Sequence, residues 1–187
     1  MTGRRVRVIL QGGALILFLL LGFLFFSSAL AGSISEEADI KAAFFLNFIK
    51  FVEWPGPAFA SPGDPYVVSV VGNDPVATAI EGLDNKTVSG RKLVVRKVSD
   101  LSSLGQCHIL YVGKSEKGKA GQVLGAVKSS PVLTVADFDG FARQGGTIGF
   151  IHKDDRIRFE INEESANKSG LKVNAKLLYL GKIVRGQ

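Results

Sequence analysis

Two periodicities of apolar residues alternate along the chain. Short runs rich in apolar and β-branched residues are typical of strands with both faces buried, and they occur at residues 66–71, 92–98, 107–112 and 131–136. Helices are expected before, between and after these strands, with the first at residues 36–52 ending before Trp54 and Pro55. Strands that alternate with helices predict a mainly parallel sheet covered on both faces.

The C-terminal part of the chain follows a different pattern. Residues 147–151 and 156–161 flank the polar segment 152–155, which predicts an antiparallel hairpin. Two further helices are expected at residues 163–169 and 175–184. The sequence therefore predicts an α/β fold with a single domain, in which helices flank a mainly parallel sheet that ends in a C-terminal antiparallel hairpin.

The first 31 residues have the three parts of a secretory signal peptide. Three arginines precede an apolar run at residues 14–26, and the small residues Ala29 and Ala31 end the segment. We expect cleavage before Gly32, which gives a signal peptide at residues 1–31 and a periplasmic α/β domain at residues 32–187. The alternative is an uncleaved membrane anchor, because the apolar stretch is nearly long enough to span a bilayer.

Composition and charge narrow the functional classes. The 187 residues carry a net charge of +6, and removal of the signal peptide with its three arginines would lower it to +3. That charge is weak evidence for nucleic acid, so no nucleic-acid partner is expected. A single cysteine, Cys107, excludes an internal disulfide and zinc sites built on cysteine pairs, and no cofactor or metal is expected.

Several segments together resemble a known family. The segment 41–55, which reads KAAFFLNFIKFVEWP, and the segment 156–162, which reads RIRFEIN, are its most specific parts. Weaker landmarks lie at residues 71–75, 89–91, 107–110, 131–135, 140–146 and 170–178. With these segments in order over residues 36–185, the chain resembles the YfiR/HmsC-like family of exported proteins.

The resemblance implies a regulator that is not an enzyme. Members of this family restrain a membrane-bound diguanylate cyclase by binding its periplasmic region, and an outer-membrane lipoprotein can sequester the regulator. The consequence would be control of cyclic di-GMP and of biofilm formation. Studied members carry paired cysteines, which this chain lacks. The alternative function is that of a periplasmic small-molecule-binding module. A third possibility is an unrecognised hydrolase, but the sequence contains no G-x-S-x-G, Walker A or H-E-x-x-H motif to support it.

The first predicted helix is apolar on nearly all sides. One face carries Ile40 and Phe44, and a second stripe consists of Phe45, Ile49 and Val52. Either the helix packs between two layers of its own domain, or the second stripe binds a partner protein or a second copy of the chain. Phe45, Ile49 and Val52 are therefore the partner-binding candidates, and Phe44 is expected in the core under both interpretations.

Two polar segments suggest sites for anions. Arg156 and Arg158 share one strand face with Glu160, which predicts either cross-strand ion pairs or a small anionic ligand held by both guanidinium groups, with His152 assisting. The segment 72–75 follows a strand and precedes a helix, as phosphate-binding turns do. Because it lacks the G-x-G-x-x-G spacing, we interpret it as a plain turn in which Asp74 caps the helix.

Overall fold

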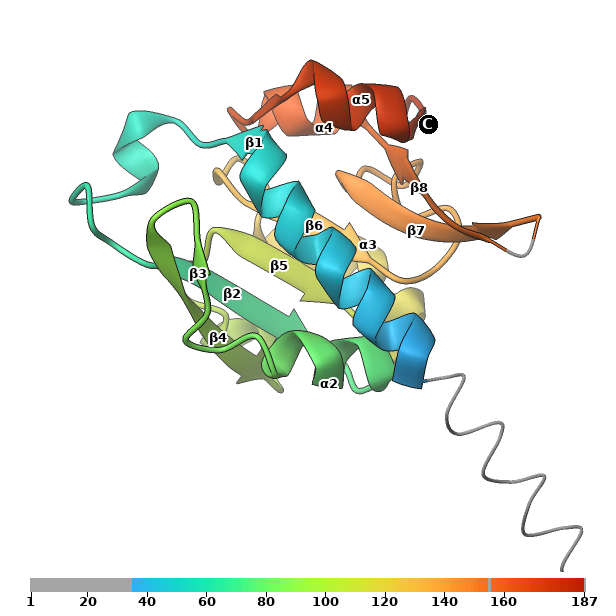
Figure 1. Ribbon diagram of the computed structural model, residues 1–187, viewed down its shortest axis with the longest axis horizontal. Helices are drawn as coiled ribbons and strands as arrows, with labels where there is room; N and C mark the ends of the chain where they lie inside the picture. Colours follow the sequence, from blue (N-terminus) through green and yellow to red (C-terminus); the bar gives the residue numbers. More distant parts are fainter. Residues whose placement is uncertain (1–34, 155, 187) are drawn as a thin grey trace, which may run out of the picture. The chain divides into compact units, whose positions relative to one another are not determined.

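The computed structural model describes residues 35–154 and 156–186 (Figure 1), so the predicted signal peptide and its cleavage site lie outside the described residues. A helix at residues 35–51, called here the N-terminal helix, begins the described chain. The other α-helices are α2 (Pro75–Glu81), α3 (Ala120–Ala126), α4 (Glu163–Lys168) and α5 (Ala175–Leu180). The strands are β1 (Val52–Glu53), β2 (Tyr66–Val71), β3 (Thr87–Val88), β4 (Arg91–Val98), β5 (Ile109–Val112), β6 (Leu133–Ala136), β7 (Ile148–Lys153), β8 (Arg156–Ile161), β9 (Lys172–Val173) and β10 (Lys182–Ile183).

Eight of these strands form one sheet in the order β10-β8-β7-β6-β5-β2-β4-β3. The central strands β4, β2, β5, β6 and β7 are parallel to one another, and β7 and β8 form the antiparallel hairpin. The short strands β1 and β9 pair separately and tie the end of the N-terminal helix to the C-terminal part of the chain. The predicted α/β class, the mainly parallel sheet and the C-terminal hairpin are all confirmed.

The order of the strands creates a switch point between β2 and β5. The chain leaves β2 through α2 toward β4 on one side, and it leaves β5 through α3 toward β6 on the other side. The loops after these neighbouring strands therefore diverge at their carboxyl ends. In open α/β sheets this is the place where a crevice forms and ligands bind.

Helices cover both faces of the sheet, as the sequence predicts. The N-terminal helix and α2 pack on one face around the buried Phe45, Phe48 and Ile80. On the other face α3 and the segment around Phe141 enclose a second core. In Figure 1 the N-terminal helix runs across one face of the sheet.

The structure differs from the prediction mainly in its short elements. The expected helix at residues 175–184 stops at Leu180, and the chain turns at Gly181 into the edge strand β10. A β-carbon at position 181 would lie 2.6–2.8 Å from atoms of Ile161 and Phe159, so only glycine lets the chain pass this closely. In residues 35–154 and 156–186, no helix combines the length and the apolar character needed to cross a membrane.

Candidate functional site

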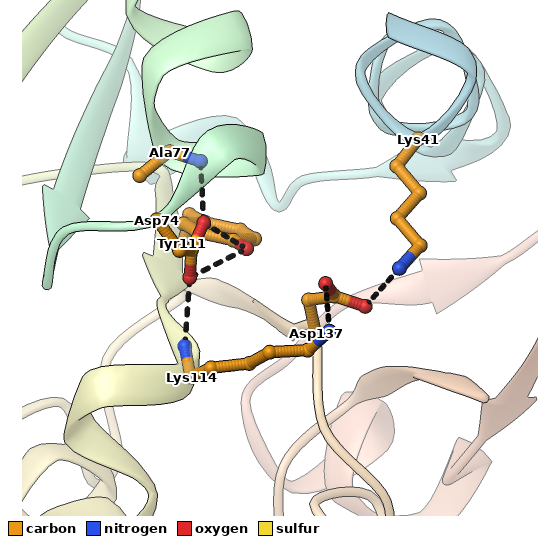
Figure 2. Close-up of polar contacts among 6 residues, drawn as sticks. All are labelled: Lys41, Asp74, Ala77, Tyr111, Lys114 and Asp137. Carbon is orange, nitrogen blue, oxygen red and sulfur yellow. Dashed lines mark hydrogen bonds and ion pairs between the residues drawn. The ribbon is translucent and has the colours of Figure 1, made fainter. Parts of the chain in front are cut away.

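A buried carboxylate organises the carboxyl end of the sheet. Asp137 directly follows β6, and its Oδ1 lies 2.5 Å from the Nζ of Lys41 on the N-terminal helix. Its Oδ2 lies 3.2 Å from the Nζ of Lys114, which follows β5. Lys41 is completely buried, whereas Lys114 is largely exposed. As Figure 2 shows, the contact between Lys41 and Asp137 joins the N-terminal helix to the end of β6.

A second carboxylate, that of Asp74, occupies the switch point itself. It caps α2 by accepting a hydrogen bond from the backbone N–H of Ala77 at 2.8 Å, and it accepts another from the backbone N–H of Lys114 at 2.7 Å. The hydroxyl of Tyr111 donates to the same carboxylate at 3.2 Å (Figure 2). The prediction that Asp74 caps this helix is confirmed.

The environment of Tyr111 keeps its hydroxyl protonated. Burial raises the pKa of Tyr111 far above its ordinary value, and the negative charges of Asp74 and Asp137 raise it further. At Gly113 a β-carbon would come within 2.7 Å of the Asp74 carboxylate, so the loop after β5 can lie this close to Asp74 only because position 113 is glycine. The chain's own carboxylate thus takes the N–H groups that would hold a phosphate at this position in a nucleotide-binding protein.

Beside this cluster lies a cavity of about 360 Å³. It is lined by the cationic Lys114 and Lys117, by His152, by the acids Asp137 and Asp139, and by the apolar Phe138, Phe150 and Ile151. Cavities of this size hold small ligands when a few polar groups converge on an apolar wall. Within the residues that the structure describes, no group of three or more His, Cys, Asp or Glu side chains is arranged to hold a metal ion.

A second buried polar centre lies at the amino ends of the strands. The ring of His108 accepts a hydrogen bond from the Val67 N–H at its Nδ1 (3.0 Å), and its Nε2 donates to the carbonyl of Ala58 at 2.9 Å. Phe59 stacks on the His108 ring at 4.4 Å, and the Arg91 guanidinium lies 3.9 Å from the other side of Phe59. Burial lowers the pKa of His108. This arrangement holds the loop before β2 in place.

The structure buries the stripe that is the partner-binding candidate. Phe45, Ile49 and Val52 all belong to the main core, so of the two interpretations the structure favours a helix packed within its own domain over a stripe that binds a partner. The first face is divided between core and solvent, because Phe48 is fully buried and Phe44 packs half-buried against the core, whereas Ile40 is 43% exposed. The helix therefore buries residues from both faces, as its nearly all-round apolar pattern allows.

The register of the hairpin separates His152 from the two arginines. Arg156 lies opposite Lys153, whereas His152 lies opposite Ile157, so His152 is on the other face of the hairpin from Arg156 and Arg158. The three side chains are exposed, and the cavity beside His152 is lined by neither arginine. The structure therefore does not bring these three residues together as one ligand site.

Glu160 forms its cross-strand ion pair with β10 and not across the hairpin. It is buried, and its Oε1 contacts Arg143 at 3.1 Å and Lys182 at 3.0 Å. The cross-strand partners of Arg156 and Arg158 are Lys153 and Ile151, neither of which is acidic. The predicted cross-strand ion pair is therefore present between Glu160 and Lys182, which lie opposite each other on β8 and β10, and the two arginines take no part in it.

An apolar surface lies exposed near the C-terminus. Tyr179 and Leu180 at the end of α5 are 90% and 60% exposed, and Ile183 in β10 is 55% exposed. We call these three residues the C-terminal apolar surface. Because β10 pairs only with β8, it is an edge strand of the sheet. Large apolar side chains that are exposed beside an edge strand are candidates for a protein contact site.

Sequence reasoning missed both the buried cluster and this surface. An aspartate that directly follows a buried strand, as Asp137 does, was the available signal for the cluster. Nothing in the sequence pairs it with Lys41, which is 96 positions away. Tyr179, Leu180 and Ile183 were hidden in a predicted helix that in fact ends before Gly181.

The fold and the site define the class of this protein as an α/β domain with the helix-capping aspartate Asp74 at its switch point. Residues 38–182 match the YfiR/HmsC-like family over most of the chain. The chain therefore belongs to the YfiR/HmsC-like family, as the segments 41–55 and 156–162 indicate.

Proposed function

We propose that this protein is an exported regulator that restrains a membrane-bound diguanylate cyclase by binding its periplasmic region. In this proposal residues 1–31 direct export and are removed, so that the mature chain acts in the periplasm. An outer-membrane lipoprotein would compete for the regulator and so release the cyclase. Membership of the YfiR/HmsC-like family supports this function, because it is the function that the family resemblance implies.

The observation that carries the proposal is the C-terminal apolar surface. Exposing Tyr179, Leu180 and Ile183 to water is unfavourable for an isolated chain, because apolar surface is stabilised by burial. A partner that covers this surface would gain the corresponding free energy. The edge strand β10 adds backbone groups that an extended segment of the partner can pair with. Protein contact at this place needs no bound cofactor and no chemical step.

The proposal is tested by measuring affinity for the periplasmic region of the cyclase by biolayer interferometry. An aspartate in place of Tyr179 or Ile183 would put a charge into a dry contact, which costs at least about 2 kcal/mol and weakens binding about 30-fold. Val94→Asp is the control, because Val94 is also exposed but lies in β4, near the opposite edge of the sheet. Unchanged affinity of both the Tyr179→Asp and the Ile183→Asp variants would contradict a contact at this surface.

The cavity beside Asp137 favours a second candidate function, that of a small-molecule-binding module. Its volume of about 360 Å³ and its mixed lining of Lys114, His152 and Phe150 suit a small charged molecule with an apolar part. A thermal-shift screen of charged metabolites tests this candidate. A molecule that raises the melting temperature of the wild type but not that of Lys117→Glu would support it.

A further inference from the structure

We propose that a pocket at the amino ends of β2 and β4 binds a carboxylate that is carried on an apolar body. The pocket has a volume of about 650 Å³, and the rings of Trp54, Phe59 and Tyr66 line it together with the guanidinium group of Arg91. We call it the aromatic pocket. It lies at the other end of the sheet from the cavity beside Asp137. The inference goes beyond the proposed function, because binding at this pocket needs no partner protein.

The strand register places a cation on the face of the sheet that carries the main core. Tyr66 pairs with Leu93 across β2 and β4, and Arg91 precedes Leu93 by two positions, so the three side chains lie on the same face. Tyr66 and Leu93 belong to the main core, whereas Arg91 is half-buried at its margin. The aromatic pocket therefore joins apolar walls to a charged group that is partly withdrawn from water.

The guanidinium group of Arg91 has hydrogen-bonding capacity that its own chain does not use. Its Nη1 donates to the carbonyl of Asp64 at 2.6 Å and to that of Ser61 at 3.4 Å, and its Cζ lies 3.9 Å from the centroid of the Phe59 ring. Further N–H donors are on Nη2 and Nε. In the described part of the chain, no hydrogen bond uses these donors and no ion pair involves Arg91. An anion that reaches them would offset the cost of holding this charge partly away from water.

The other charges around the aromatic pocket also favour an anion. Lys50, near the end of the N-terminal helix, is a second cation of the lining, and Glu53 is the one acid among the described lining residues. Glu53 lies opposite Lys172 in the pairing of β1 with β9, so a lysine faces its charge. Cations therefore outnumber acids at the pocket. The planar fork of the Arg91 guanidinium matches the geometry of a carboxylate.

The aromatic rings indicate that the anion carries an apolar body. Trp54 and Phe59 are half-buried, and their ring centroids lie 5.1 Å and 5.4 Å from that of Tyr66. The indole N–H of Trp54 donates to the carbonyl of His108, which fixes the ring. The Tyr66 hydroxyl has no hydrogen bond to another described residue, and burial raises its pKa, so it stays protonated and can donate to the same carboxylate as Arg91. Small-molecule sites combine such apolar walls with a few polar groups.

The fluorescence of Trp54 makes binding directly measurable, because it is the one tryptophan of the chain and lines the pocket. Hydrocinnamate, which carries its carboxylate on a phenyl-bearing chain, should change the fluorescence of the exported chain to saturation. Hydrocinnamyl alcohol has the same body without the charge and should bind at least about 10-fold more weakly. Inorganic phosphate, which lacks an apolar body, should also bind far more weakly than hydrocinnamate.

Three variants locate the site. Arg91→Gln should weaken the binding of hydrocinnamate about 10- to 100-fold and leave that of the alcohol unchanged, because hydrogen bonds to a charged group are lost. Tyr66→Phe keeps the ring and should weaken hydrocinnamate binding about 5-fold, and it tests the site without touching the loop contacts of Arg91. Lys92→Gln is the matched control, because Lys92 is exposed on the other face of β4 and does not line the pocket. Circular dichroism checks that each variant is folded.

Two results would overturn this proposal. Equal affinity for hydrocinnamate and its alcohol would show that no charge is selected, and wild-type affinity of folded Arg91→Gln and Tyr66→Phe would remove the location. A carboxylate of this kind comes from a free acid or from the C-terminus of a peptide. The tripeptide glycyl-glycyl-phenylalanine distinguishes the two sources, because it binds more tightly than hydrocinnamate only if the pocket accepts a peptide end. The proposed function is tested separately at Tyr179 and Ile183, so either proposal can fail while the other stands.

Discussion

Asp137→Asn should destabilise the domain strongly. The substitution keeps the shape of the side chain, but it removes the negative charge that lies 2.5 Å from the fully buried ammonium of Lys41. Removing one partner of a buried ion pair typically costs about 3–5 kcal/mol. In a domain of this size each 1 kcal/mol lowers the melting temperature by roughly 2–4 °C, so we expect a fall of about 10 °C.

The assay is thermal unfolding followed by circular dichroism, with urea unfolding for the free energy. Asp139→Asn is the matched control, because Asp139 is exposed and only two positions away, and its melting temperature should change little. Adding Lys41→Met to Asp137→Asn should recover part of the loss, since a neutral pair leaves no buried charge. A melting temperature of Asp137→Asn within about 2 °C of the wild type would refute this reasoning.

Three further predictions concern the core and the strand ends. Ile49→Asp should prevent folding or cost more than about 4 kcal/mol, seen as lost periplasmic protein, because Ile49 lies in the core; a folded variant would contradict this burial. Stability measured by urea unfolding should decrease as the pH falls below about 6.5, since the lowered pKa of His108 means that the unfolded chain binds the proton more readily; His108→Gln should reduce this dependence. Gly146→Ala should lower the melting temperature by several degrees, because its β-carbon would overlap the buried ring of Phe141, whereas Gly121→Ala, with open space, should not.

The sheet was predictable because its strands are marked by their own residues. The run at residues 66–71 became β2 without a change of bounds, and the second hairpin strand, β8, also kept its bounds at residues 156–161. Both combine β-branched or aromatic residues with clear turn signals, so local sequence and tertiary structure agree. The two-residue strands β1, β3, β9 and β10 were missed because so short a segment has no periodicity and forms only where a distant partner lies beside it.

The candidate site was less predictable, because it depends on contacts between distant residues. Periodicity placed Phe44 and Phe45 on different stripes, but the sheet and not the helix decides how far each side chain is buried. The same limit applies to His152, whose position opposite Ile157 follows from the pairing of β7 with β8. Residue types in a single sequence state what chemistry is available, and the pairing of strands decides which groups meet.

The central claim, restraint of a diguanylate cyclase through protein contact, is tested most directly by the cyclic di-GMP content of cells, measured by mass spectrometry. Deleting the gene should raise cyclic di-GMP, and the wild-type chain should restore it to its former level. A chain with Tyr179→Asp and Ile183→Asp, exported in normal amount, should fail to restore it, whereas Val94→Asp should succeed. Unchanged cyclic di-GMP after the deletion would contradict the account.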